Sequence, residues 1–231
     1  MGTVAENREA VESRIAVAAR RAGRDPAGVT LVAVSKLIPV ERVREGIAAG
    51  LRVLGENYVQ EARTKIAELG RGVAWHLVGH LQANKAKHAV ELFDLIHSLD
   101  SVELALELDR QAERRGRAEV PVLVQLSLAG EATKSGVSEQ ALLPLLKAIV
   151  PLRHVSVQGL MTMPPYVEDP EASRPFFRAL RELRERVEKE GIERVTMAHL
   201  SMGMSHDFEV AIEEGATLIR VGTAIFGPRP A

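Results

Sequence analysis

Short apolar runs alternate with amphipathic segments along most of this 231-residue chain. The runs rich in valine, leucine and isoleucine span Thr30 to Ser35, Arg52 to Gly55, Ala74 to Gly79, Leu95 to Ser98, Val120 to Leu126, Val155 to Met161, Thr196 to Leu200 and Thr217 to Val221. Their length and composition predict strands. Helical periodicity fills most of the intervals, over Val40 to Ala49, Val59 to Leu69, Val102 to Arg115, Glu139 to Ile149 and Pro175 to Glu190.

The repeated alternation of strand and helix predicts parallel strands, because each helix returns the chain to the same edge of the sheet. Eight such units in a chain of this length favour an α/β fold, a closed (β/α)8 TIM barrel, over an open doubly wound sheet. The count depends on the two short runs at Arg52 and Leu95. An extra amphipathic helix precedes the barrel, with Val4, Val11 and Ile15 on one face. No linker, repeat or low-complexity stretch divides the chain, so we expect a single domain over residues 1–231.

Composition narrows the classes of function. Lysine and arginine number 30 against 31 aspartates and glutamates, so no overall field favours nucleic acid or an anionic membrane as a partner. The chain has no cysteine, which excludes disulfides, thiolate metal sites and a cysteine nucleophile and fits a reducing compartment. Charged residues interrupt the first twenty positions, so we expect no signal peptide, and no segment is apolar enough to cross a bilayer. These features predict a cytoplasmic protein.

Polar residues stand where several predicted strands end, at the face that holds the active site in such barrels. They are Lys36, Glu56, Asn57, His80, Ser127, Thr162, Ser201, Gly222 and Thr223. Lys36 is the most informative, because burial of its stem would leave a partly desolvated amine that can form a Schiff base. Position alone equally allows a lysine that reaches solvent or pairs with Glu56 or Glu41.

The segment around Gly222 is the second signal. Gly222 lets the backbone approach a ligand closely, Thr223 offers an N–H and a hydroxyl, and a short helix starting there would direct its N-terminus at an anion. Phosphate sites of barrels commonly follow strands seven and eight, where the stretch Ser201 to Ser205 and Gly222 fall. Together the two glycine motifs predict a phosphate site, whereas either one alone is explained by the shape of a turn.

Closure of the barrel adds an arginine to this site. The eighth strand must pair with the first, so Arg220 and Lys36 would face the same interior. A buried guanidinium needs an acceptor, and a ligand ring nitrogen or an acid would serve. The alternative is an internal ion pair between Arg220 and Glu56.

Other polar features indicate less. His76 and His80 lie four apart in a predicted strand, which separates them by about 13 Å, too far to share one metal ion. We therefore expect no metal site. The loop from Gly130 to Gly136 either closes over a ligand or is a plain connection.

The residues at these strand ends resemble those of a known family, the pyridoxal 5'-phosphate (PLP) homeostasis proteins, which are similar to the N-terminal barrel domain of alanine racemase. The matching motifs are Val34-Ser35-Lys36, Gly55-Glu56-Asn57-Tyr58-Val59-Gln60-Glu61, Trp75-His76-Leu77-Val78-Gly79-His80-Leu81-Gln82-Ala83-Asn84-Lys85, Gly130-Glu131-Ala132-Thr133-Lys134-Ser135-Gly136, Gly159-Leu160-Met161, Leu200-Ser201-Met202-Gly203-Met204-Ser205 and Ile219-Arg220-Val221-Gly222-Thr223-Ala224-Ile225-Phe226-Gly227. They run nearly end to end, in order and at family spacing.

The resemblance implies a PLP fold type III-like barrel with PLP held as a Schiff base on Lys36. It places Arg220 beside the pyridine nitrogen and Asn57 near the cofactor. Phosphate contacts are implied from Ser201, and equally from Gly222 and Thr223. A cation at the pyridine nitrogen disfavours its protonation, which weakens the ring as an electron sink for carbanion chemistry.

Several functions remain open on this evidence. The leading hypothesis is an intracellular PLP binding protein that serves PLP homeostasis without robust turnover, supplies PLP-dependent apoenzymes, and exists as a monomer or weak dimer. The alternatives are a PLP enzyme of narrow scope, such as an amino-acid racemase using Lys36 as one base, a Schiff-base aldolase or other phosphate-binding barrel without PLP, and a barrel used only as a binding scaffold.

Overall fold

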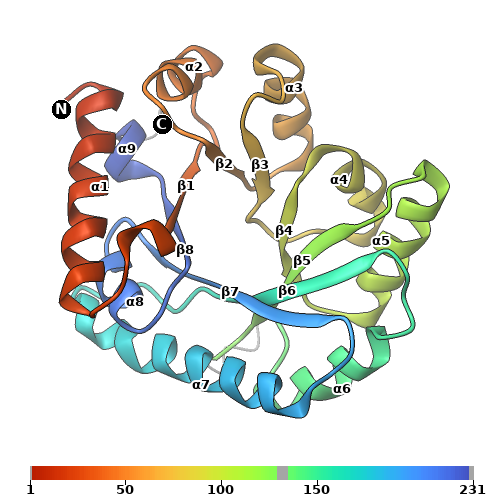
Figure 1. Ribbon diagram of the computed structural model, residues 1–231. Coiled ribbons are helices and arrows are strands. Elements are labelled where there is room, and N and C mark those ends of the chain that lie inside the picture. The colour runs from red at the N-terminus through yellow and green to blue at the C-terminus, as the bar shows by residue number, and fades with distance from the viewer. Residues whose placement is uncertain (1, 129–134, 229–231) are drawn as a thin grey trace.

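A closed barrel of eight parallel strands forms the centre of the computed structural model, which describes residues 2–128 and 135–228 (Figure 1). The strands, in barrel order, are β1 (Thr30–Val34), β2 (Val53–Glu56), β3 (Ala74–Leu77), β4 (Leu95–Leu99), β5 (Val120–Leu126), β6 (Val155–Thr162), β7 (Val195–Met204) and β8 (Leu218–Val221). Pairing of β1 with β8 closes the barrel. The predicted TIM barrel is therefore confirmed.

Helices surround the barrel and cover the outer face of the strands (Figure 1). They are α1 (Val4–Arg21), α2 (Val40–Ala48), α3 (Val59–Leu69), α4 (Ala86–Leu92), α5 (Val102–Arg115), α6 (Glu139–Ile149), α7 (Arg174–Glu190), α8 (Phe208–Glu213) and α9 (Thr223–Phe226), with 3-10 turns η1 (Pro26–Gly28), η2 (Ala83–Lys85) and η3 (Pro170–Ser173). None of the helices in the described part of the chain is long and apolar enough to cross a membrane.

The apolar residues form two layers that the alternation of strand side chains separates. One layer lies between strands and helices and includes the fully buried Trp75, Phe177 and Phe208. The other is a small cluster inside the barrel, made by Val32, Leu95, Leu123, Met161 and Leu218. Because this inner cluster fills the barrel, a ligand has room only beyond it, at the strand ends.

Strand β7 is longer than the sequence predicted. The expected strand ended at Leu200, but the observed one continues to Met204. Its pairing with β8 shifts register between Ser201 and Met204, and Gly203 within that stretch has a φ of +89°. The positive φ lets the backbone absorb the irregularity without leaving the sheet. The stretch that was expected to form a loop is thus largely strand.

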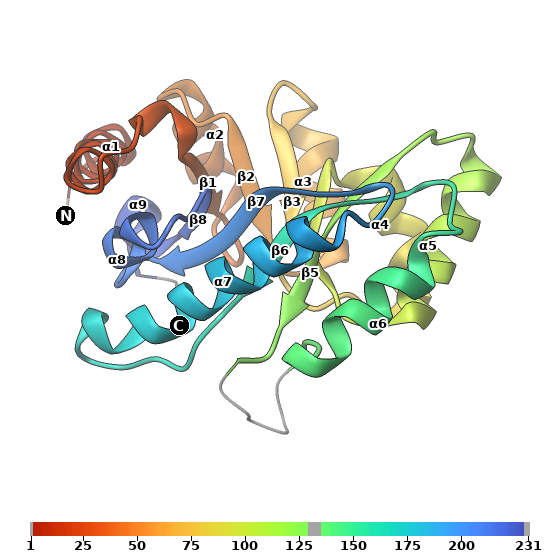
Figure 2. The same ribbon diagram turned by 60° about the horizontal axis from the view of Figure 1, so that its bottom comes forward.

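Helix α1 packs on the outside of α8 and α9, next to the closing strand (Figure 2). Its N-terminus carries a capping box formed by Thr3 and Glu6. Asn7 Nδ2 donates to the carbonyl of Ile225 at 2.9 Å, and Arg24, beyond the helix, donates to the carbonyl of Ala216 at 2.8 Å. The two ends of the chain are therefore joined by side-chain to backbone hydrogen bonds.

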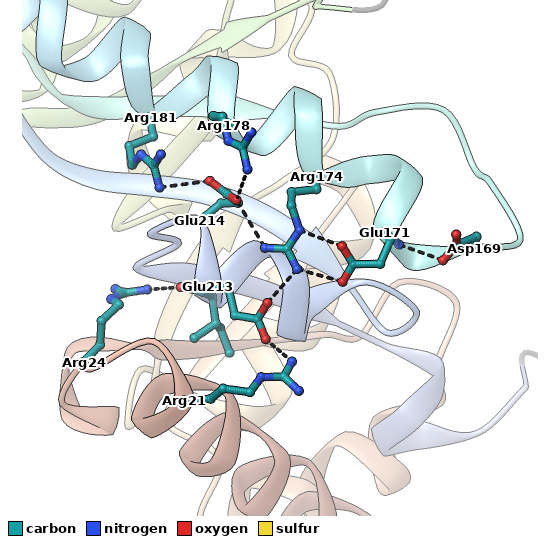
Figure 3. Close-up of polar contacts among 10 residues, drawn as sticks. Arg21, Arg24, Asp169, Glu171, Arg174, Arg178, Arg181, Glu213 and Glu214 are labelled. Carbon is teal, nitrogen blue, oxygen red and sulfur yellow. Dashed lines mark hydrogen bonds and ion pairs between the residues drawn. The ribbon is translucent and has the colours of Figure 1, made fainter.

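An ionic network holds α8 between α1 and α7 (Figure 3). Glu214 is almost fully buried, and its carboxylate contacts Arg174 at 3.2 Å, Arg178 at 3.1 Å and Arg181 at 2.9 Å. Burial raises the pKa of Glu214, but its hydrogen bonds and charge interactions with these arginines outweigh that effect and lower it overall. The neighbouring Glu213 contacts Arg174 and an arginine of α1. The network fixes the element that follows the end of β7.

Gly159 is a position where the barrel tolerates no side chain. It pairs with His199 across β6 and β7 and has a φ of +155°. A Cβ placed there would lie 1.9 Å from the carbonyl oxygen of His199. We predict that Gly159→Ala lowers the free energy of unfolding by about 3 kcal/mol or more, measured by urea denaturation. Gly70→Ala is the control, because Gly70 also has a positive φ but no atom within 4 Å. Equal losses in the two variants would contradict the steric explanation.

Candidate functional site

A cavity of about 540 Å³ opens at the carboxyl ends of the strands. Its polar lining consists of Lys36, Asn57, His80, Gln125, Ser127, Ser135, Tyr166, Ser205, His206, Arg220, Gly222 and Thr223. Apolar residues such as Val34, Val78 and Met161 complete the wall. A hollow of about 600 Å³ on the outer face of α5 contains none of the predicted site residues, so we assign the chemistry to the barrel cavity.

The cavity brings together all but one of the residues predicted to bind a cofactor. Lys36 and Asn57 follow β1 and β2, Arg220 lies on β8, and Gly222 and Thr223 come directly after it. Ser201 is the exception, because it is fully buried within β7 and does not line the cavity. Its placement disagrees with the expected phosphate contact.

Ser205, at the other end of the same motif, comes directly after the end of β7. It lines the cavity, and its Oγ accepts from the backbone N–H groups of Gly222 at 3.3 Å and Ala224 at 3.4 Å. The motif contains both serines, and the strand was expected to end at Leu200, whereas it ends at Met204, next to Ser205. Asp207 supports this turn, since its carboxylate accepts from the N–H of Met204 at 2.7 Å.

The donors around Ser205 suit an anion. The hydrogen bonds that its Oγ accepts are long, so the N–H groups of Gly222 and Ala224 can turn to a stronger acceptor. Thr223 adds a hydroxyl at the same edge of the cavity. Helix α9 spans only Thr223–Phe226, which is too short for a substantial dipole. The short helix that the sequence predicted is present, and the N–H groups of Gly222 and Ala224 in its first turn are the donors in this part of the site.

Arg220 is buried and keeps its charge. It donates to Ser201 Oγ at 2.5 Å and to the carbonyl of Thr162 at 2.9 Å. Burial lowers the pKa of Arg220 to about 10, which leaves the guanidinium protonated at neutral pH. The internal ion pair with Glu56 that the sequence left open does not form, because the carboxylate of Glu56 contacts Lys65 at 2.8 Å. Both hydrogen-bond acceptors of Arg220 are neutral groups, so its charge faces the cavity uncompensated by them.

A chain of hydrogen bonds orients Arg220 from below. His97 Nδ1 lies 2.9 Å from Ser201 Oγ, and His97 Nε2 lies 3.0 Å from His76 Nδ1. Because a guanidinium only donates, Ser201 Oγ accepts from Arg220 and donates its own hydrogen to His97 Nδ1. The proton of His97 then sits on Nε2 and is donated to His76. The direction of every bond in this chain follows from the charge of Arg220.

Burial keeps both histidines neutral, as this chain requires. It lowers the pKa of His76 to about 4 and places the pKa of His97 well below its ordinary value. The sequence assigned these residues no role, since neither has metal-ligand spacing. Only the register of neighbouring strands reveals that they meet inside the barrel.

The loops after β2 and β3 fit closely against each other. A Cβ on Gly79 would lie 2.5 Å from the carbonyl oxygen of Asn57, so glycine is needed for Asn57 to reach the cavity. His80 lies beyond the end of β3, and its Nδ1 is 3.3 Å from a carboxylate oxygen of Asp100. This pair places an imidazole with a carboxylate partner at the cavity wall.

Most of the loop from Gly130 to Gly136 lies outside the described residues. Its described end is attached to β5: Gln125 Nε2 donates to the carbonyl of Ser135 at 2.8 Å, and the N–H of Val137 donates to the carbonyl of Gln125 at 2.9 Å. Ser135 thereby joins the cavity lining.

Comparison with known proteins defines the class to which this barrel belongs. The family described as "Alanine racemase, N-terminal domain" matches residues 7–230. The chain is 47% identical over 220 residues to a pyridoxal phosphate homeostasis protein of Aquifex aeolicus, covering 95% of each chain. It is 44% identical to one of Pseudomonas aeruginosa, covering 99% of this chain and 97% of that protein.

A solved structure agrees with this relationship. PipY of Synechococcus elongatus, with PLP bound, superposes with a TM-score of 0.85 at 38% identity, covering 97% of this chain and all of that one. The chain thus has a PLP-type barrel of the kind found at the N-terminus of alanine racemase. It belongs to the pyridoxal phosphate homeostasis protein family.

The two buried histidines predict how stability depends on pH. Each takes up a proton in the unfolded chain near its ordinary pKa but stays neutral in the fold until lower pH. The free energy of unfolding should therefore fall as the pH drops below about 6.5, by up to about 1.4 kcal/mol per pH unit for each histidine. Urea denaturation at several pH values measures this slope. His76→Gln should make it shallower, whereas His88→Gln on α4 should not; identical slopes in the two variants would refute the assignment.

Proposed function

We propose that this protein binds PLP as a Schiff base on Lys36 and serves PLP homeostasis without robust turnover of its own. The observation that supports this best is one cavity that holds Lys36, the charged Arg220 and the donors of the segment after β8. PLP supplies an aldehyde that condenses with a primary amine, with loss of water, and a ring that withdraws electrons. The names of the relatives and the PLP bound to PipY support the same cofactor.

In this proposal each side of the cavity has a separate task. Lys36 supplies the amine, and Asn57 contacts the cofactor beside it. Ser205, Gly222 and Thr223 bind the phosphate, with Ser205 in the place expected for Ser201. Arg220 faces the pyridine nitrogen.

The charge on Arg220 favours holding the cofactor over reacting it. A guanidinium that stays protonated opposes protonation of a neighbouring ring nitrogen, which lowers the capacity of the ring to accept electrons. The hydrogen-bond chain through Ser201 and His97 keeps this charge in place. We further propose that the recipients of PLP are PLP-dependent apoenzymes and that a single-domain monomer or weak dimer acts in the cytoplasm.

The test is the visible spectrum of the purified protein with PLP, before and after borohydride reduction. We expect an absorption band at longer wavelength than the absorption of the aromatic residues. After reduction, peptide mapping should place the adduct on Lys36. Lys36→Ala should lose both signals. Lys147→Ala, at an exposed position on α6, should keep them. A colourless protein would support an aldolase or a barrel without PLP, and an adduct on another lysine would contradict the assignment.

One observation favours the second function that the sequence left open, a PLP enzyme of narrow scope such as a racemase. His80 lines the same cavity as Lys36 and is paired with Asp100, so it offers a second group for proton transfer. Burial raises the pKa of Asp100, and His80 opposes that shift.

Exchange of the α-proton of amino acids with deuterated water separates the two functions. Our proposal predicts no exchange above that of free PLP for any common amino acid, measured by NMR or mass spectrometry. Exchange that His80→Ala abolishes while PLP remains bound would favour the racemase instead.

A further inference from the structure

Lys65 is a buried lysine that the proposed site does not use. It lies on α3 with only 4% of its side chain exposed and does not line the cavity. Its Nζ donates to the carbonyl of Ser35 at 2.5 Å, to Glu56 at 2.8 Å and to Glu61 at 2.7 Å. Burial of an ammonium group costs free energy that an ion pair often does not recover, so the arrangement needs a reason.

The partners of Lys65 hold the backbone on both sides of Lys36. On one side, Glu56 accepts from Ser35 Oγ at 2.6 Å, and Lys65 binds the carbonyl of the same serine. On the other side, Glu61 accepts from the N–H of Leu37 at 2.6 Å. We call Glu56, Glu61 and Lys65 the buried triad. It contacts both chain neighbours of Lys36 from the outer side of the barrel.

The backbone at Leu37 needs such support. Leu37 has a φ of +60°, in the left-handed region that branched L-residues rarely adopt. Its side chain is 54% exposed, so packing of that side chain does little to compensate for the strain. Among the described residues other than glycine, only Arg194 shares a positive φ. The hydrogen bond from Leu37 to Glu61 is therefore a contact that favours the strained turn.

The triad also leaves one buried polar atom without a hydrogen bond. Glu56 is fully buried, and its second oxygen has no hydrogen-bond partner among the described residues. An apolar set of the same volume would avoid both the unpaired oxygen and the buried charges. A role in stability alone does not account for this choice, whereas a need to hold the turn at Lys36 does.

We propose that the buried triad positions Lys36 by holding the Lys36-Leu37 turn in its strained conformation, so that the amine is presented to the cavity before PLP arrives. Glu56, Glu61 and Lys65 are positioning residues in this inference, since they act through the backbone and do not contact the cofactor. The inference rests on the proposed Schiff base at Lys36. It adds that part of the affinity for PLP comes from preorganisation of this turn.

Glu61→Ala tests the inference with the full chain, because Glu61 is partly exposed and its loss spares the core. We expect the dissociation constant for PLP, from titration of the visible band, to rise about tenfold. The pH at which this band titrates should shift, because the Lys36 amine is no longer held in one position. Glu61→Gln retains an acceptor for the N–H of Leu37 and should stay closer to the parent. Glu185→Ala removes the carboxylate of another helical (i, i+4) ion pair, the one with Arg181, and should behave like the parent.

Rescue at Leu37 separates positioning from a merely structural role. Asparagine adopts the left-handed conformation more readily than leucine, so Leu37→Asn needs less help from Glu61. The double variant Glu61→Ala/Leu37→Asn should therefore recover most of the lost affinity and the parental pH of titration. If α3 merely needed Glu61 for anchoring, this exposed substitution would restore nothing.

Two outcomes would overturn the inference: a dissociation constant and spectrum unchanged in Glu61→Ala, or an equal loss in the single and double variants. Neither resembles failure of the proposed function. If the parent protein itself gives no borohydride adduct on Lys36, the Schiff base is wrong. If the parent gives the adduct and one of these two contradicting outcomes is observed, only the proposed role of the triad fails.

Discussion

The pairing of β1 with β8 is the constraint on which the rest of this molecule depends. In the observed register Val32 lies opposite Arg220. Side chains of a strand alternate between its two faces, so Val32, Val34 and Lys36 share the interior with Arg220. Lys36, near the start of the chain, thereby lines the same cavity as Arg220, near its end. Helix α1 then packs over α8 and α9 and supports this junction from outside.

The protein treats its two buried cations in opposite ways. Lys65 is surrounded by two carboxylates and a carbonyl, so its charge is compensated locally. Arg220 is hydrogen-bonded to a hydroxyl and a carbonyl, both neutral, and it lines the cavity. The carboxylate of Asp207 favours this charge only through space, so the guanidinium remains available to a ligand. The contrast separates a cation compensated within the fold from one that faces the cavity, as the proposed cofactor site requires.

This arrangement is consistent with a protein that holds PLP. The hydrogen-bond chain below Arg220 orients its guanidinium, and the histidines in that chain are neutral, so they do not compensate its charge. The N–H groups that suit an anion are those of Gly222 and Ala224, just after β8, and their hydrogen bonds to Ser205 are long. Binding then exchanges weak internal hydrogen bonds for stronger ones to a phosphate, which favours affinity while little of the barrel needs to move.

Several features followed from the sequence alone, because they depend on local pattern. Short apolar runs between helical segments predicted the barrel. Polar residues at strand ends, with Arg220 added by closure of the barrel, predicted most of the cavity. The motifs also identified the family correctly. Pattern fails where a strand continues through polar residues, and for that reason Ser201 was placed after a strand that in fact continues to Met204.

Only the tertiary structure decided which distant polar groups are partners. The register of parallel strands and the rotation of each helix against them decide these contacts. They determine that Glu56 pairs with Lys65 and not with Arg220, and that His76 and His97 are hydrogen-bonded. Neither quantity is encoded in a run of neighbouring residues. The left-handed turn at Leu37 was equally invisible, because leucine gives no local sign of a conformation that long-range hydrogen bonds impose.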